Sequence, residues 1–285
     1  MKTLLLTIVV AGLALSVRAG TTIDSTSRDA YGANIGWVDW YADSNNGAVI
    51  NDYYCSGYIY AANVGWINLG SGSPANLIRY QNLAANDFGV NNDGMGNLSG
   101  CAYGANIGWI AFEPTGAPAF KPDTGQFSGY AWSANCGWIS LSNAFAYVQT
   151  DRVLEGPLST NGLPIPWLMS WFGATNVDPN SDPDGSGMTI GQDYIAGLNP
   201  TDPNSVLRIT AQSFGPGGTS ATLTWTSVMT RRYYVMKTTS LLAPISWTDS
   251  GLEMVWPDGA STTRTFGDSA APNRFYQVQA VRPLP

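Results

Sequence analysis

One short phrase recurs four times in the first half of the chain: an aromatic residue, two or three small residues, then Asn-x-Gly-Trp and a β-branched residue. The Asn of each copy stands three residues before a Trp, and the successive Trp residues are 29, 43 and 29 residues apart. A fixed period of this size is typical of repeat architectures, in which each copy is one supersecondary unit. The copies are YGANIGWV from Tyr31, YAANVGWI from Tyr60, YGANIGWI from Tyr103 and WSANCGWI from Trp132.

Each copy has the pattern of a β-hairpin. In the fourth copy, Ala131 and Trp132 fall on opposite faces of one strand, and Trp138 and Ile139 fall on opposite faces of the next. We expect a tight reversal at Asn135 between them, because Asn tolerates a positive φ and can hold a turn with its own side chain. Repeated hairpins of this kind stack or close into one body, and we predict an all-β repeat domain of stacked hairpins over residues 20–150.

The repeated Trp residues have two interpretations. Trp that recurs beside a β-branched residue is typical of a core, so we expect these rings to be buried. The alternative is a carbohydrate-binding face, because a flat aromatic ring stacks on a pyranose and the chain has 11 Trp and 14 Tyr. A binding face would show several coplanar, exposed rings in a row. The candidates for it are Trp37, Trp66, Trp109, Trp132 and Trp138.

The start of the chain has the pattern of a secretory signal peptide over residues 1–19. Lys2 supplies the charge, Leu4 to Leu15 is apolar, and Val17-Arg18-Ala19 provides small residues at positions −3 and −1. The apolar stretch is too short for a comfortable membrane span. We therefore predict a protein that is secreted, either extracellular or on the cell surface, with no membrane span in the mature chain.

The charge of the chain disfavours nucleic acid as a partner. The full sequence carries a formal net charge of −7, and removal of Lys2 and Arg18 with the signal peptide would leave −9. Binding to a phosphate backbone requires clustered Lys and Arg, and only Lys121 and Lys237 would remain as lysines. Extracellular polysaccharide and other surface proteins are the partners that this composition leaves.

The cysteines are Cys55, Cys101 and Cys136. Alignment of the copies places Cys101 in a column with Tyr58 and Tyr130, and Cys136 in a column of Ile and Val. In such apolar columns we expect buried free thiols. The alternative is one disulfide between two of the three, which an oxidising compartment would permit.

The composition also disfavours catalysis. The chain has no histidine, which is the commonest general base and the commonest zinc ligand. Paired carboxylates can cleave glycosides, but neither Glu113 nor Asp39 recurs in every copy, and no convergent acid–base set is recognisable. We predict that the protein is not an enzyme, with glycoside cleavage as the less favoured alternative.

The pattern changes after the repeats. Residues 151–205 predict a linker that contains a helix over Pro164–Phe172 and a second helix over Thr189–Ala196. Residues 206–285 return to alternation of apolar and polar positions, which predicts a small antiparallel β-sandwich.

The loop between the two helices, DPDGSGMTIGQD from Asp182, fits the twelve-residue calcium loop of an EF-hand in register. A hard divalent cation needs six or more oxygens, and a loop that doubles back on itself can supply them. The predicted ligands are the side chains of Asp182, Asp184, Ser186 and Asp193 and the backbone carbonyl of Met188.

Three departures from the EF-hand pattern predict weak binding. Ser186 replaces the usual acid, Ile190 at position 9 offers no side-chain oxygen, and Asp193 at position 12 is shorter than Glu. We expect a dissociation constant on the order of 10⁻⁴ to 10⁻³ M, as in extracellular modules. Calcium is the predicted cofactor; the alternative is an acidic linker that binds no ion.

Three stretches resemble known families. The segment DPDGSGMTIGQDYIAGLNPTDPNS resembles the single calcium loops of dockerin-like and thrombospondin type 3-like segments, which commonly join a variable N-terminal region to a C-terminal β domain. The phrase GYAWSANCGWISL is similar to GYAWSxNIGWI repeats of bacterial surface proteins that have no assigned activity. The segment from LTWTSVMTRRYYVMKTTSLLAPISW to FYQVQA resembles a fibronectin type III-like β-sandwich. Dockerins proper carry two loops, so the resemblance does not imply cohesin binding.

Together these features predict a secreted, calcium-stabilised structural or adhesive protein of the cell surface or extracellular matrix. The alternative is a carbohydrate-binding module that uses exposed Trp and Tyr.

Overall fold

In a computed structural model of the chain, the described residues are 20–268 and 273–284. The structure is mainly β, with 41% of the chain in strands, and the described residues include two short helices. It divides into two compact units, one formed by the described residues up to Val177 together with Leu284, and one formed by Asp178–Pro283. The signal peptide expected at residues 1–19 lies outside the described residues. Within the described ranges, no helix is long and apolar enough to cross a membrane.

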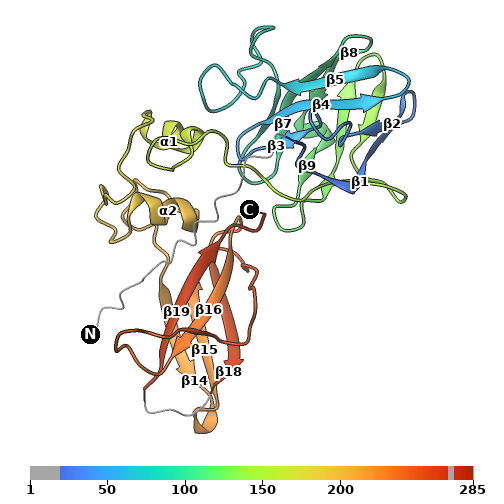
Figure 1. Cartoon of the computed structure of the whole chain (residues 1–285). Coiled ribbons are helices and arrows are strands. Elements are labelled where there is room, and N and C mark those ends of the chain that lie inside the picture. Colours follow the sequence, from blue (N-terminus) through green and yellow to red (C-terminus); the bar gives the residue numbers. More distant parts are fainter. Residues whose placement is uncertain (1–19, 269–272, 285) are drawn as a thin grey trace. The chain divides into compact units, whose positions relative to one another are not determined.

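The first unit, here called the barrel unit, is built around a closed eight-stranded antiparallel barrel (Figure 1). Neighbouring strands follow the order of the chain, and the last strand pairs with the first through Tyr31–Ser140 and Gly32–Ile139. The hairpins therefore close on one another, which is the second of the two arrangements expected of such repeats. The strands are β1 (Ile23–Gly32), β2 (Gly36–Asp39), β4 (Cys55–Ala61), β5 (Gly65–Gly70), β7 (Leu98–Gly104), β8 (Gly108–Phe112), β11 (Tyr130–Ser133) and β12 (Gly137–Ser140).

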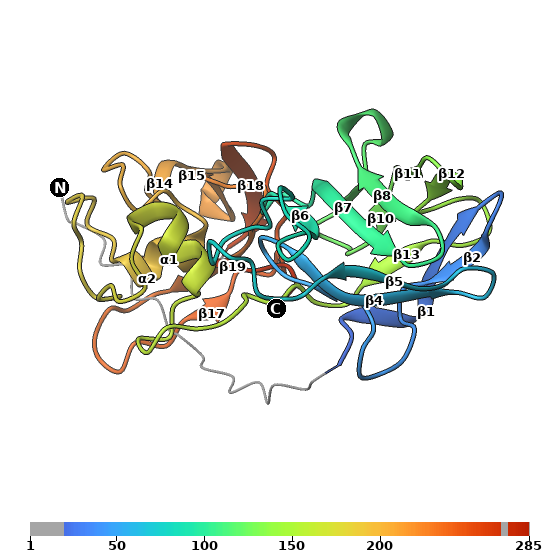
Figure 2. The ribbon, with the colours of Figure 1, turned by 90° about the horizontal axis from the view of Figure 1, so that it is seen from above.

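Shorter elements extend this wall, which Figure 2 shows from above with β4 and β5 beside β7 and β8. They are β3 (Val49–Ile50) on β4, β6 (Val90–Asn92) on β7, β13 (Val148–Thr150) on β1, the pair β9 (Ala119–Phe120) and β10 (Phe127–Ser128), and a 3₁₀ turn at Pro114–Gly116.

The barrel interior is filled by side chains of alternating size. In three of the four hairpins, a buried Ala of the first strand faces a buried β-branched residue of the second strand; in the second hairpin, Ile59 faces Ile67. A small side chain facing a large one lets the rows from opposite walls interdigitate, so the barrel encloses a packed core. The facing residues of these three hairpins are Ala30 and Val38, Ala102 and Ile110, and Ala131 and Ile139.

Trp40 is a core residue of the barrel unit. Trp40 follows β2 and is 1% exposed. Its ring lies 5.1 Å from the ring of Phe127 and 6.3 Å from that of Phe112, and Phe120 packs on Phe127 at 5.4 Å. These four aromatic residues belong to the main core cluster of the barrel unit.

The helix α1 (Ile165–Phe172) also belongs to the barrel unit. It ends at Gly173, whose positive φ of 62° places it in the left-handed region and whose N–H bonds to the carbonyl of Met169. Trp167 and Leu168 are buried, whereas Trp171 is 40% exposed.

The second unit, here called the C-terminal unit, begins with the acidic loop and the helix α2 (Ile190–Ala196). Thr189 and Gln192 form a capping box at its start, and Gly197 ends it with a φ of 72°. The unit continues with two three-stranded antiparallel sheets, ordered β14-β15-β18 and β17-β16-β19. Their strands are β14 (Ile209–Phe214), β15 (Ser220–Thr226), β18 (Ser261–Gly267), β17 (Thr248–Asp249), β16 (Arg232–Thr238) and β19 (Phe275–Val281), with a 3₁₀ turn at Pro216–Gly218.

Both sheets contribute to one core. Trp225 from β15 packs its ring 6.0 Å from that of Tyr233 of β16. Met188 of the acidic loop and Ala196 of α2 belong to the same cluster of buried residues. The acidic loop therefore packs on the core of the C-terminal unit. The helix α1, which precedes the loop in the sequence, belongs to the barrel unit.

Candidate functional site

The Asn of each repeated phrase joins its hairpin to the preceding one. Its Nδ2 donates to the backbone carbonyl of the residue after the Asn in the previous copy, at 2.9–3.1 Å. The four bonds run in a ring, because the Asn of the first copy bonds to the fourth copy. They are Asn34 to Cys136, Asn63 to Ile35, Asn106 to Val64 and Asn135 to Ile107.

The Gly of the phrase makes the turn. In each hairpin the Gly before the Trp has a φ between 70° and 81°, the left-handed region that Gly adopts without a steric cost. The expectation that Asn135 would take this conformation and hold its own turn was therefore wrong. Gly137 adopts the left-handed conformation in this hairpin. The side-chain amide of Asn135 donates a hydrogen bond to the neighbouring hairpin instead.

The Trp of the phrase pairs across its hairpin with an aromatic residue six positions earlier. In each hairpin, this pair is the next one along the strands after the pair of residues that flanks the turn. The four pairs therefore occupy equivalent positions. The ring centroids are 4.9–5.0 Å apart and the ring planes are inclined by 58–61° in all four. We call these residues the aromatic collar; the pairs are Tyr31–Trp37, Tyr60–Trp66, Tyr103–Trp109 and Trp132–Trp138.

The collar lies on the outside of the barrel. Trp37, Trp66, Trp109 and Trp138 are 45–50% exposed and Trp132 is 38% exposed. The expectation that these Trp residues form the core is wrong, because the β-branched residue that follows each Trp takes the inward position in a strand of period two. The rings also differ from the coplanar row expected of a flat binding face, since the two rings of each pair are steeply inclined and each pair belongs to a different hairpin.

A third ring extends three of the four pairs. Tyr58 lies 6.3 Å from Trp66, and Tyr130 lies 6.1 Å from Trp138. In the third copy the ring comes from a loop, because Phe88 lies 5.1 Å from Trp109 at an interplanar angle of 83°. These partners were not predicted; for Tyr58 and Tyr130 the signal was an aromatic residue two positions before the first ring of the phrase, and Phe88 has no such signal.

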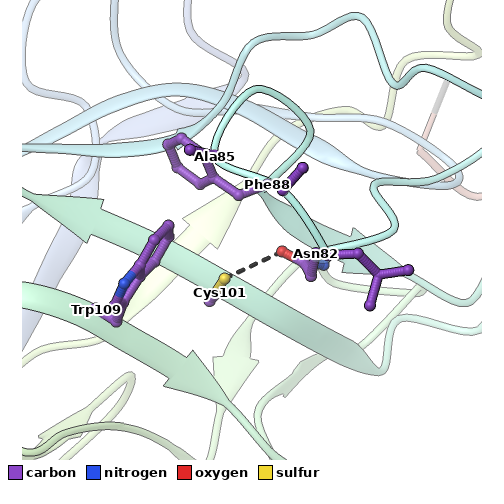
Figure 3. A pocket seen from close by; sticks show the side chains of 7 residues that line it. Asn82, Ala85, Phe88, Cys101 and Trp109 are labelled. Carbon is purple, nitrogen blue, oxygen red and sulfur yellow. Dashed lines mark hydrogen bonds between the residues drawn. The ribbon is translucent and has the colours of Figure 1, made fainter.

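The three thiols are free. Cys55 and Cys136 are buried, as expected, and burial raises the pKa of Cys55 to about 12. Cys101 is only half-buried, because its column faces outward where Tyr58 and Tyr130 are exposed. Its Sγ–H donates to Oδ1 of Asn82 at 3.0 Å, in a pocket beside Trp109 (Figure 3).

The acidic loop brings the predicted calcium ligands near one another. Asp182 accepts from the N–H groups of Ser186 and Gly187 at 3.1 and 2.9 Å, and Asp184 accepts from that of Ser186 at 3.0 Å. The Ser186 hydroxyl lies 3.5 Å from the carbonyl oxygen of Met188. These bonds fold the loop back on itself around its carboxylates.

Asp193 is the most constrained of these residues. Its side chain is completely buried, and neither carboxylate oxygen has a hydrogen-bond partner. Burial, with the nearby carboxylates of Asp184 and Asp182, raises the pKa of Asp193 to about 7. Oδ2 of Asp184 is likewise buried without a partner. A buried carboxylate without donors is costly, so the donor set fits a cation in this loop.

The loop does not form a tight acidic cluster. Among the described residues, no group of three or more His, Cys, Asp or Glu side chains is close enough to hold a metal ion. The calcium site over Asp182, Asp184, Ser186, Met188 and Asp193 therefore stays a prediction.

The acids considered for catalysis are Asp39 and Glu113. Asp39 pairs with Arg28 at 3.1 Å and accepts from the N–H groups of Tyr41 and Ala42. Glu113 is exposed and precedes the 3₁₀ turn.

Comparison with known proteins gives no relative for the chain: no family model matches it, and neither does any curated protein or solved structure.

Proposed function

We propose that the chain is a secreted, non-catalytic adhesive protein whose barrel binds a neutral polysaccharide of the cell surface or extracellular matrix through the aromatic collar. One observation carries the proposal: Trp37, Trp66, Trp109, Trp132 and Trp138 are all substantially exposed. Large aromatic side chains that gather at a surface mark interaction sites, because their exposure to water is unfavourable unless a ligand covers them.

The chemistry of the collar suits a sugar polymer. An indole face stacks on the apolar face of a pyranose, while the hydroxyl groups of the sugar and the Tyr phenols stay hydrated. The acidic net charge of −7 disfavours an anionic polymer and leaves a neutral one.

The fourfold repetition supports an adhesive role. Because the four pairs have the same geometry, one barrel offers four weak sites of one kind. Sites linked on one rigid body raise the apparent affinity for a polymer by about 10²–10⁴ without new contacts. Two chains of a polymer held by different pairs would be cross-linked.

We also propose that calcium binds the acidic loop and stabilises the C-terminal unit. The supporting observation is that both carboxylate oxygens of Asp193 are buried without a partner. A bound cation would offset the cost of burying this charge. The further ligands would be the carboxylates of Asp182 and Asp184, the hydroxyl of Ser186 and the backbone carbonyl of Met188.

A depletion assay tests the polysaccharide proposal. The full-length mature chain is mixed with insoluble cellulose, chitin, mannan and β-1,3-glucan, and the protein left in solution is measured. We expect at least one neutral polymer to deplete the protein and anionic alginate to leave it in solution. If none of the four polymers depletes it, or if alginate does so as well as they do, the proposal is wrong.

A further inference from the structure

The pocket beside Trp109 distinguishes the third hairpin from the others. It has a volume of about 350 Å³. Figure 3 shows Cys101 at its centre, between the ring of Trp109 and the amide of Asn82, with Phe88 and Ala85 above. This volume lies at the lower end of the roughly 300–1,000 Å³ typical of small-molecule sites, and it is large enough to admit one sugar ring.

The pocket exists because a small residue replaces a ring. Cys101 pairs with Ala111 across its hairpin, just as Tyr58 pairs with Asn68 and Tyr130 with Ser140. In the second and fourth copies the Tyr at this position fills the space beside the Trp, with centroids 6.3 and 6.1 Å apart. In the third copy the thiol is much smaller than a phenol ring, and the ring beside Trp109 is Phe88, which comes from a loop and leaves a pocket next to the thiol.

The loop between β5 and β6 shapes the walls of this space. Phe88 stands almost perpendicular to Trp109, at 83° and 5.1 Å, so the two rings form a corner. Oδ1 of Asn82 accepts from the N–H of Gly89 and from the Cys101 thiol, both at 3.0 Å, which fixes the amide at the base. Leu83 at the rim is 89% exposed. The lining thus combines two aromatic faces with one polar group, as binding of a sugar ring requires.

We propose that this pocket holds one pyranose ring of the neutral polysaccharide, stacked on Trp109 and walled by Phe88, in the place that a Tyr ring fills in the second and fourth copies. The proposal rests on the polysaccharide-binding function proposed above. It makes the third hairpin the one that selects the sugar, whereas the remaining pairs of the collar add avidity.

Cys101 reports directly on occupancy of the pocket. Cys55 and Cys136 are buried, so iodoacetamide at alkaline pH should alkylate Cys101 first in the folded full-length chain. The probes are the soluble hexasaccharides of cellulose, chitin, mannan and β-1,3-glucan. We expect the hexasaccharide of the polymer that depletes the protein to slow this alkylation by about tenfold or more at saturation, because the sugar covers the thiol.

Two substitutions of the same residue provide the matched comparison. Cys101→Tyr installs the side chain that the second and fourth copies already carry, so it should fill the pocket and weaken hexasaccharide binding by about tenfold or more. Cys101→Ser keeps the space and should bind as the wild type does. Both variants should still be depleted by the insoluble polymer through the other three pairs.

The outcomes separate the two proposals. If a polymer depletes the protein but its hexasaccharide neither protects Cys101 nor distinguishes Cys101→Tyr from Cys101→Ser, the pocket is not a sugar site and the collar proposal stands alone. If no polymer depletes the protein, the polysaccharide function fails and the pocket proposal fails with it. The alkylation measurement uses the wild type, so it decides the matter even if Cys101→Tyr folds poorly.

Discussion

Asn34 and Cys136 stand 102 residues apart in the sequence, yet Nδ2 of Asn34 donates a hydrogen bond of 3.0 Å to the backbone carbonyl of Cys136. The other three hairpins are joined to their predecessors by the same bond. The contact that ties neighbouring copies therefore also ties the last copy to the first. The repeated phrase thus supplies the bond at the closure of the barrel as well, because every copy carries both the donor and the acceptor.

The first prediction concerns this ring. Asn34→Ala should lower the free energy of unfolding by about 0.5–1.5 kcal/mol, the usual contribution of one hydrogen bond. Asn63→Ala should cost a similar amount, since its bond to Ile35 has the same geometry. Urea denaturation of both variants gives the comparison. A cost for Asn63→Ala with none for Asn34→Ala would mean that the barrel is open between its first and last strands.

The second prediction concerns the Gly that precedes the Tyr or Cys of three copies. A Cβ on Gly129 would overlap the carbonyl oxygen of Ala117, whereas a Cβ on Gly162 would have no atom within 4 Å. Both residues have a φ near 80°, so both pay the left-handed penalty of about 1–2 kcal/mol on substitution by Ala. Gly129→Ala should lower the free energy of unfolding by about 1–3 kcal/mol more than Gly162→Ala does, because the loop that contains Ala117 must move. Equal losses of stability for the two variants in chemical denaturation would contradict the close approach of the Ala117 loop to Gly129.

The third prediction separates core from collar. Trp40→Ala removes a ring that is 1% exposed and should cost about 3–5 kcal/mol. Trp138→Ala removes a ring that is 45% exposed and should cost far less, near the 0.5–1.5 kcal/mol of an aromatic pair. Thermal or urea unfolding of the barrel unit measures both. Equal losses would place Trp138 in the core after all.

Much of this arrangement could be predicted from the sequence. The four phrases predicted four hairpins, and the strands of the barrel fall on them. The alternation of Trp138 with Ile139 also contained the answer to which of the two is buried, since adjacent residues of a strand face opposite sides. We assigned the Trp to the core because it recurs beside a β-branched residue, whereas the small Ala131 on the facing strand indicated that Ile139 points inward.

The remaining features depend on contacts that no local pattern encodes. The bond from Asn34 to Cys136 requires the barrel to close, and closure follows from the tilt and pairing of all eight strands. The pocket beside Trp109 requires Phe88 to arrive from a loop that only the 43-residue step between the second and third copies provides. The alignment of the copies showed that Cys101 stands where two other copies have a Tyr, but it did not show that a pocket would result.

The fourth prediction concerns calcium. If the acidic loop binds calcium with a dissociation constant of about 10⁻⁴ M, a millimolar concentration should stabilise the C-terminal unit by about 1.4 kcal/mol. The combined substitution of Asp182→Ala and Asp184→Ala should abolish the gain. Because the loop belongs to the C-terminal unit, the barrel unit should unfold almost unchanged.

Calorimetric titration and limited proteolysis measure this effect. EDTA should increase cleavage between Gly173 and Asn204 in the wild type but have little effect on the doubly substituted chain. Absence of heat at millimolar calcium, together with proteolysis that EDTA does not change, would show that the stretch is an acidic linker.

The central claim is that the exposed Trp residues of the collar bind the polysaccharide. It is tested most directly by affinity electrophoresis of the chain in gels that contain a soluble form of the polymer found in the depletion assay. The wild type should be retarded in proportion to the polymer concentration. A chain with Trp37, Trp66, Trp109 and Trp138 all replaced by Ala should migrate as it does without polymer.

Trp171→Ala is the matched control, because Trp171 is 40% exposed but lies on α1, outside the collar. The account predicts that this variant is retarded as strongly as the wild type. Equal retardation of the fourfold variant and the wild type, with both shown to be folded by circular dichroism, would contradict the account.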